Sequence, residues 1–153
     1  MQHEAPHLSF PRLASATVRD MDRWLGDGGM PLIGELGAAI TAYGEGWATA
    51  EWRPTPIACN PAGTVQAGVQ SVLLDAVMNF ALLAALEPGE RCATLEMKVS
   101  TMRPALAGAE LTLRGEVLRA GRRVAFLQGF LRQGEETLTH ATATFAVLRP
   151  DPP

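Results

Sequence analysis

Charged side chains are scarce in this sequence of 153 residues. They make up 19% of the chain, against about 25% in an average globular domain. Basic residues number 13 and acidic residues 16, so the net charge is −3. A general nucleic-acid binder needs a basic face, and this balance argues against such a partner. The charge-poor surface instead favours burial against another subunit, and a local arginine cluster could still hold a small anion.

Cysteine is also nearly absent. Cys59 and Cys92 form neither a CxxC pair nor a Cys/His metal spacing, so we expect two free thiols and no metal site. Residues 1–20 lack the basic stretch followed by an apolar run that marks a signal peptide. The most apolar window, residues 72–86, contains polar residues and falls short of the ~18 uncharged residues of a spanning helix. We therefore expect a cytoplasmic protein that does not contact a membrane.

Apolar residues are plentiful, at 47% of the chain, and the length suits one domain whose core needs no disulfide or metal. Residues 1–12 contain two prolines and no periodicity, which is typical of a loose tail. Residues 20–25 are predicted to form a short helical turn. We therefore divide the chain into an N-terminal tail with a short turn, residues 1–30, and one domain, residues 31–150.

Alternation of apolar and polar residues predicts six strands. They span residues 33–42, 47–53, 94–103, 110–119, 124–132 and 137–148. The fourth, fifth and sixth strands are joined by short glycine-containing turns, so the sheet is predicted to be antiparallel. In the third strand, the alternation puts Leu95, Met97 and Val99 on one side.

Residues 65–86 are apolar on nearly every side, which is typical of a helix in the middle of a domain. The apolar face of the sheet must bury against this helix, which gives an α+β architecture. One helix leaves the edges of such a sheet uncovered, and uncovered edges favour dimerisation.

Asp75 is an anomaly because it lies within this apolar helix, where a lone carboxylate is costly to bury. Ser71, Asp75 and Asn79 share one polar stripe about 80° wide on the helix. The stripe could face solvent, the carboxylate could pair with an arginine, or it could perform chemistry. The residues alone leave these alternatives open.

The loop at residues 60–68 leads into the helix, whose first N–H groups lack partners and suit a developing oxyanion. Ala67 and Gly68 are small enough to permit close approach to this backbone. An ordinary turn into a helix has the same composition, and Asn60 can equally bond its own turn. Gln66 and Asp75 are nine residues apart and point to opposite faces of the helix. If both are catalytic, a second subunit must complete the site.

Four segments of the sequence resemble the hotdog-fold acyl-CoA thioesterases of the phenylacetate-degradation (PaaI-like) type. They are Asn60-Pro-Ala-Gly-Thr-Val-Gln66-Ala-Gly68, Leu73-Leu74-Asp75, Thr94-Leu-Glu-Met-Lys-Val and Arg103-Pro104. The resemblance extends over roughly residues 32–148. It implies a hotdog fold, in which a six-stranded antiparallel sheet wraps a long central helix. It also implies dimers whose sheets join edge to edge, often paired into tetramers, with two sites at each dimer interface.

The resemblance also implies roles for single residues. Asp75 matches the catalytic carboxylate, which acts as a nucleophile or as a general base on water. The N–H groups near Ala67 and Gly68 match the oxyanion donors. Asn60 matches an asparagine that orients the carboxylate or the thioester, and Thr94 matches a serine or threonine that positions water.

Two residues depart from the family pattern. Gln66 stands where many members have histidine; it can donate a hydrogen bond to a carbonyl but cannot change protonation near neutral pH. We therefore expect Gln66 to polarise the carbonyl or anchor the turn. Ala67 replaces a glycine, which requires a negative φ there and slightly narrows the approach to the backbone.

Arg119, Arg122 and Arg123 flank one predicted hairpin turn. They are either a solvated turn or a site for the phosphates of coenzyme A, which suit the arginine fork. Arg91 and Arg103 are weaker candidates. His140 has no acidic or cysteine partner in the pattern, and we expect it to be structural.

We predict an acyl-CoA thioesterase that needs no cofactor or metal and forms a homodimer or homotetramer. One alternative is a non-catalytic acyl-CoA sensor, which would keep the pocket and the arginines but not need Asp75. Another is an acyl-thioester dehydratase or hydratase, which needs a histidine where this motif has glutamine. The pocket for the acyl group is expected to involve the Trp24 region, Phe80, Leu83 and the partner chain.

Overall fold

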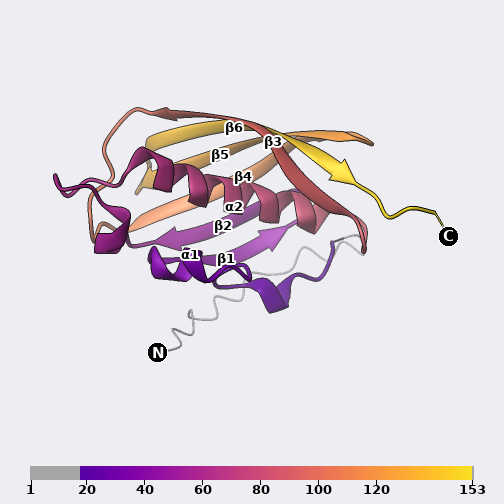
Figure 1. Ribbon diagram of the computed structural model, residues 1–153, viewed down its shortest axis with the longest axis horizontal. Helices are drawn as coiled ribbons and strands as arrows, with labels where there is room; N and C mark the ends of the chain where they lie inside the picture. The colour runs from indigo at the N-terminus through magenta and orange to yellow at the C-terminus, as the bar shows by residue number, and fades with distance from the viewer. Residues whose placement is uncertain (1–17, 153) are drawn as a thin grey trace.

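A long helix crosses one face of a six-stranded antiparallel sheet in the computed structural model, which describes residues 18–152 (Figure 1). The helix, α2, spans Ala67–Ala85 and begins and ends within two residues of the predicted bounds. The α+β architecture with one central helix is therefore confirmed. The loose tail expected at residues 1–12 lies outside the described residues, and the domain boundary expected at residue 30 stays a prediction.

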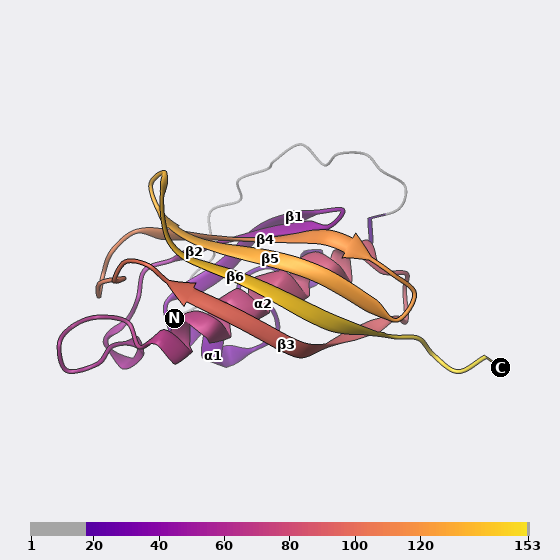
Figure 2. The same ribbon diagram turned by 90° about the horizontal axis from the view of Figure 1, so that it is seen from above.

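The sheet has the strand order β1-β2-β4-β5-β6-β3. The strands are β1 (Ala38–Gly44), β2 (Trp47–Trp52), β3 (Arg91–Thr101), β4 (Leu111–Ala120), β5 (Val124–Gln133) and β6 (Glu136–Leu148). Although β3 directly follows α2 in the chain, it pairs with β6 and forms an edge of the sheet. Seen from above, the sheet arches over α2 (Figure 2). Two short 3-10 helices lie at Asp22–Trp24 and Pro56–Ala58.

The buried core lies between α2 and the concave face of the sheet. Leu74, Val77 and Met78 of α2 are completely buried there. By length and composition alone α2 could span a membrane, but it packs as the core helix of the domain. The inward residues predicted for the last strand, from Thr139 to Val147, are also buried.

The predicted start of the first strand was wrong. Residues from Pro31 to Glu35 form the helix α1, and the strand begins only at Ala38. Proline at the first helical position has a backbone angle that suits a helix start. Ile33 and Leu36, three residues apart, are both buried, so one face of this turn packs against the core.

The predicted alternation in β3 was wrong at Leu95. The pairing of β3 with β6 shifts between Thr94 and Glu96, so Leu95 is an extra residue in a β-bulge. Leu95 is 60% exposed, whereas Met97 and Val99 pack against the core. The bulge therefore changes which residues at this end of β3 face the helix.

One buried polar pair links the helix to the sheet. The Thr139 hydroxyl donates to Oε1 of Gln70 at 2.5 Å, and both residues are buried. Because each group satisfies the other, the polar atoms are tolerated in an apolar core.

The backbone of α2 lies very close to the sheet at Gly115 in β4. A Cβ atom at this position would lie 2.6 Å from the Val77 carbonyl oxygen and 2.8 Å from the Met78 amide nitrogen. Both atoms belong to the helix backbone and cannot rotate away. Only glycine permits this distance between α2 and β4.

We expect Gly115→Ala to lower the free energy of unfolding by about 1–3 kcal/mol, because the added methyl forces the helix off the sheet. Chemical denaturation measures the effect. Gly34→Ala in α1 is the matched control, since its nearest neighbour atom would be 3.8 Å away, and it should be neutral or slightly stabilising. Equal stability of the two variants would contradict this account of the packing.

Candidate active site

Asp75 and Thr94 meet at the flank of α2. The Thr94 hydroxyl on β3 donates a hydrogen bond of 2.6 Å to Oδ1 of Asp75. Asp75 is half-buried, and its other oxygen has no hydrogen-bond partner among residues 18–152. A carboxylate that is held by one oxygen and free at the other can accept a proton or attack an electrophile. The two residues that the sequence selected separately are thus brought together.

A second contact lies one helical turn further along. Asn79 donates from its side-chain amide to Sγ of Cys92 at 3.4 Å. The pKa of the Cys92 thiol is raised from 9.0 to about 11, mainly by burial and in smaller part by the negative charge of Asp75, while Arg19 acts in the opposite direction. Cys92 and Cys59 are both free thiols, as predicted. The shifted pKa keeps Cys92 protonated at neutral pH.

Asp75 and Asn79 also line a cavity of about 650 Å³, a size typical of small-molecule sites. Phe80 and Leu83 continue the lining along α2, and the N-terminal segment that contains Trp24 supplies the other side. The expectation that Trp24, Phe80 and Leu83 share a pocket is therefore confirmed. This part of the pocket lies within one chain.

The N-terminus of α2 lies away from this cavity. Gln66 is the N-cap residue, and Gln66, Ala67 and Gly68 are all exposed. No acceptor for the N–H groups of Ala67 and Gly68 is found in the described part of the chain. Asp75 is eight residues beyond Ala67, or ~12 Å along the axis. A single chain does not bring these donors to the carboxylate.

Asn60 lies in the loop that precedes α2. Its side chain donates to the Thr64 hydroxyl at 2.7 Å and accepts from the amides of Ala62 and Thr64 at 3.0 and 3.2 Å. These contacts close the loop on itself. Within one chain, Asn60 therefore contacts its own turn and not Asp75.

Two of the three candidate arginines share a cleft. Arg122 and Arg123 lie between β4 and β5 and line a cleft of about 500 Å³ together with Arg149, which follows β6. Arg119 is exposed on β4 and does not line this cleft. Arg149 also lies 3.6 Å from the Glu90 carboxylate. Arginine forks converging on an open cleft suit a phosphate ligand.

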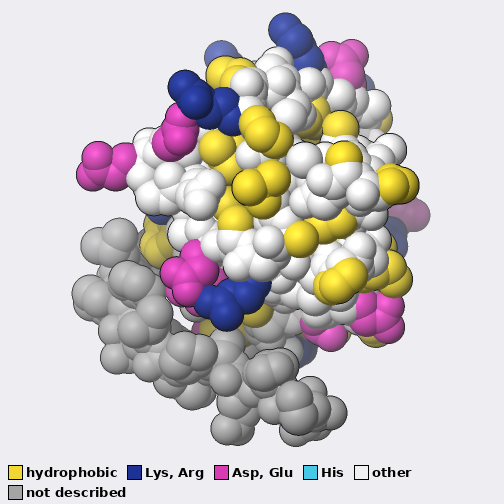
Figure 3. Space-filling model, turned by 90° about the vertical axis from the view of Figure 1, so that its left-hand side faces the viewer, with side chains coloured by type: hydrophobic (Ala, Val, Ile, Leu, Met, Phe, Trp, Pro, Cys, Tyr) yellow, Lys and Arg dark blue, Asp and Glu magenta, His cyan; other side chains and the backbone are white. Residues whose placement is uncertain are grey.

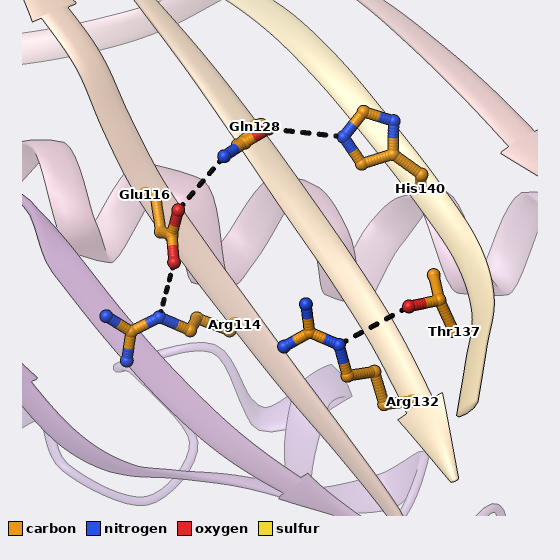
Figure 4. Close-up of polar contacts among 6 residues, drawn as sticks. All are labelled: Arg114, Glu116, Gln128, Arg132, Thr137 and His140. Atoms are coloured by element: carbon orange, nitrogen blue, oxygen red, sulfur yellow. Dashed lines mark hydrogen bonds and ion pairs between the residues drawn. The ribbon is translucent and has the colours of Figure 1, made fainter. Parts of the chain in front are cut away.

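His140 lies on the convex face of the sheet, away from α2 (Figure 4). Its ring is 3.4 Å from Gln128, which donates to Glu116, and Glu116 accepts from Arg114 at 2.6 Å. The hydrogen bond from Arg114 lowers the pKa of Glu116. This network is separated from Asp75 by the sheet, in keeping with a structural role for His140.

Sequence reasoning missed several residues around the site. Asn79 belonged to the predicted polar stripe but was not selected, and Cys92 precedes Thr94 by two positions, a spacing that puts both on one side of a strand. Arg19 and Arg149 carried no local signal. Over the described residues, no group of three or more metal-ligating side chains is found.

A family profile matches most of this region. The profile describes the acyl-CoA thioesterase N-terminal domain and matches residues 60–146, more than half of the chain. The match includes Asp75, Thr94 and the N-terminus of α2. It begins after the segment that contains Trp24.

Three solved structures resemble the chain. A phenylacetic acid degradation-related protein from Ralstonia eutropha is 35% identical, with a TM-score of 0.71 over 76% of this chain and 89% of that one. A thioesterase family protein from Silicibacter pomeroyi is 25% identical, with a TM-score of 0.75 over 84% and 95%. A variant of the phenylacetic acid degradation protein PaaI from Thermus thermophilus is 21% identical, with a TM-score of 0.69 over 78% and 99%, and it shares the fold. The fold is therefore the expected hotdog fold.

The raised pKa of the Cys92 thiol can be used to test whether Cys92 and Asp75 lie side by side. In a Cys59→Ser background, alkylation of Cys92 should rise with pH toward a midpoint of about 11. Asp75→Asn removes a negative charge that disfavours the thiolate, so the midpoint should fall, yet stay above 9.0 because the thiol remains buried.

Glu96→Gln is the control, because it removes an acidic charge from the same strand that does not contribute to the shift. The rate of alkylation as a function of pH gives the midpoint for each variant. An unchanged midpoint in Asp75→Asn would contradict the arrangement of Asp75 beside Cys92.

Proposed function

The chain belongs to the acyl-CoA thioesterase family, and we propose that it hydrolyses an acyl-CoA thioester to a carboxylic acid and coenzyme A, with Asp75 as the catalytic carboxylate. The observation that carries this assignment is the hydrogen bond from Thr94 to Asp75, whose carboxylate lines the cavity. A carboxylate in an apolar helix is costly unless it is used or paired. Within residues 18–152 Asp75 has one hydrogen-bond partner, and it faces a space large enough for a substrate.

Hydrolysis requires that water oxygen bonds to the thioester carbon while the carbon–sulfur bond breaks. As a general base, Asp75 accepts the proton from water, and this proton reaches the departing sulfur as the thiol forms. As a nucleophile, an oxygen of Asp75 bonds to the thioester carbon while the carbon–sulfur bond breaks, and coenzyme A leaves as a thiolate. Water then opens the mixed anhydride and restores the carboxylate, and a proton released from this water converts the thiolate to the thiol. Thr94 orients the carboxylate in both routes, so that its other oxygen faces the attacking water in the first route and the reacting carbon in the second.

The oxyanion that develops during attack needs hydrogen-bond donors. The exposed N–H groups of Ala67 and Gly68 are suitable, but they are too far from Asp75 in the same chain. We therefore assign them to the site of a second copy, with Gln66 polarising the carbonyl and Asn60 fixing the loop. Each dimer then contains two composite sites.

Two surfaces support a dimer. Strand β3, which carries Thr94, is an edge strand with most of its residues exposed, so a second copy could extend the sheet beside Asp75. The end of the molecule where α2 begins shows apolar side chains across its middle (Figure 3). Ile57, in the 3-10 helix at Pro56–Ala58, and Leu106, in the loop before β4, are exposed and add to the apolar surface available to a partner.

Coenzyme A carries phosphates that need a cationic site. The cleft lined by Arg122, Arg123 and Arg149 provides three guanidinium groups at one end of the sheet. We assign this cleft to the phosphates. It extends the predicted arginine site by Arg149, and Arg119 is expected to contribute less because it does not line the cleft.

A non-catalytic acyl-CoA sensor would have the same cavity and arginines. The hydrogen bond from Thr94 favours catalysis, because a sensor has no need of an oriented carboxylate. Release of thiol from acyl-CoA separates the two functions. Binding without release would support the sensor.

We expect Asp75→Asn to lower kcat by ~10²–10⁴-fold, because it removes the base or nucleophile. Thiol release from acyl-CoA measures the rate. Circular dichroism and gel filtration should show an unchanged fold and oligomer. Hydrolysis by this variant at close to the native rate would overturn the role of Asp75.

Variants of Thr94 test the hydrogen bond between Thr94 and Asp75 at its donor. Thr94→Val removes the hydroxyl but keeps the shape, and we expect kcat to fall by about 10- to 100-fold as a hydrogen bond to a charged group is lost. Thr94→Ser keeps the hydroxyl and should retain most of the activity. Equal rates for the valine and serine variants would show that the hydrogen bond has no role in turnover.

The arginine cleft predicts an effect on binding alone. Arg122→Ala combined with Arg123→Ala should raise KM for an acyl-CoA by about five- to tenfold, with little change in kcat. The same acyl group on N-acetylcysteamine lacks the phosphates, so its KM should not change. Arg119→Ala is the matched arginine control and should raise KM less. A KM increase with both substrates would argue against phosphate binding in the cleft.

A further inference from the structure

The cavity beside Asp75 has an outer wall made by the N-terminal segment of the described chain, residues 19–33. This segment supplies a large share of the lining, including Met21, Trp24, Met30 and Ile33. It precedes the part of the chain that matches the family profile, which begins at residue 60. The hydrolysis assigned to Asp75 does not require such a wall. The wall therefore needs a separate functional explanation.

Backbone hydrogen bonds hold the wall at its first residue and at its middle. The amide of Arg19 donates to the carbonyl of Ala84 at the end of α2, at 3.1 Å. Gly26 and Ile40 exchange two hydrogen bonds of 2.9 and 2.6 Å, so the segment pairs with β1. The wall is therefore built onto the helix and the sheet.

Tyr43 binds the wall near its start. Its hydroxyl accepts from the amide of Met21 at 2.8 Å and donates to the Asp22 carboxylate at 2.5 Å. Its ring packs edge-on against Phe80, which lines the cavity, with 5.5 Å between the ring centroids. Burial and the bond to Asp22 raise the pKa of Tyr43 to about 12, so the hydroxyl keeps its proton at neutral pH.

The indole of Trp24 is the largest side chain in the wall. It packs directly on Gly29, where a Cβ atom would lie 2.7 Å from the ring. Gly29 has a φ of +79°, which an ordinary residue rarely adopts, so the backbone fits the ring only with glycine there. The Arg23 guanidinium stacks 5.1 Å from the ring centroid. These contacts fix the indole beside the cavity.

The opposite side of the cavity is a line of residues along α2. Asp75 stands near one end, and Phe80 and Leu83 continue the apolar lining. Eight residues separate Asp75 from Leu83, which corresponds to ~12 Å along the helix. The lining then becomes cationic, with Arg19 beside the end of α2 and Arg91 at the start of β3. A substrate's apolar chain that starts at Asp75 can therefore extend over ~12 Å of apolar lining before it reaches these two arginines.

From this arrangement we propose that the cavity binds an apolar acyl chain of medium length, about octanoyl to decanoyl, and that Trp24 determines this specificity. The proposal rests on the function assigned to Asp75. A short acyl group would leave Phe80, Leu83 and the wall without contacts. A chain much longer than the apolar lining would reach the arginines, where burial of its end is unfavourable.

The first experiment measures kcat/KM for a series of linear acyl-CoA substrates from acetyl to palmitoyl. We expect kcat/KM to rise by up to about fourfold per methylene as each one is buried, to peak at octanoyl or decanoyl, and to fall at least tenfold by palmitoyl. An optimum at acetyl, or a rise that continues to palmitoyl, would overturn the proposal. Absence of thiol release from every substrate would instead contradict the proposed hydrolysis.

A binding measurement distinguishes failure of the acyl specificity from failure of the proposed hydrolysis. Titration of the Asp75→Asn variant with octanoyl-CoA and acetyl-CoA reports the cavity without turnover. We expect octanoyl-CoA to bind at least tenfold more tightly. Equal affinities would overturn the acyl specificity even if hydrolysis is established by other substrates.

Variants of the wall test Trp24 directly. Trp24→Ala should lower the octanoyl-to-acetyl ratio of kcat/KM by about tenfold, because octanoyl reaches the wall and acetyl does not. Phe126→Ala is the matched control, since Phe126 is 49% exposed on β5 and does not line the cavity. An unchanged ratio in Trp24→Ala would overturn the role of Trp24.

Tyr43→Phe provides a second test if Trp24→Ala does not fold. It keeps the ring against Phe80 and removes only the hydroxyl that holds Met21 and Asp22. We expect the octanoyl-to-acetyl ratio to fall by two- to fivefold as the wall loosens. A ratio equal to that of the native protein would show that the fastening of the wall does not control specificity.

Discussion

The packing of one apolar helix into the curve of a single sheet is the constraint on which the rest of the structure depends. At Gly115, the backbone of α2 approaches β4 so closely that no side chain fits between them. The apolar side chains of α2 around this contact are buried. What remains on the open flank is the stripe that contains Asp75 and Asn79, so the same packing that forms the core also determines where a polar site can lie.

Strand β3 turns that flank into a site. Because β3 crosses from the end of α2 to the far edge of the sheet, it passes beside the polar stripe and not beneath the apolar core. The bulge at Leu95 sends the apolar side chain outward near the point where Thr94 reaches Asp75. An edge strand has free backbone groups, and this one carries a site residue. Catalysis and assembly are therefore linked in the proposed dimer by the position of one strand.

Different parts of the chain have different roles in this proposal. The carboxylate, its hydroxyl partner and the N-terminus of α2 all lie within the region matched by the family profile. The acyl wall comes from residues 19–33, before that region, and Arg149 comes from beyond it. The wall is held by contacts to Tyr43 and Ile40, and its Met21 and Ile33 side chains are part of the buried core.

The sequence by itself determined the features that depend on local periodicity. The long helix, the last three strands and the anomalous position of Asp75 follow from patterns within a few residues, and so does the motif that led to the family. The five-residue α1 was missed because so short a turn has no clear period. Tertiary structure alone decided the contact of Thr94 with Asp75, the burial of Cys92, the grouping of Arg149 with Arg122, and the position of Trp24. Each of these joins residues far apart in the chain, and such contacts depend on strand order, a bulge and the closure of the wall, which no local pattern encodes.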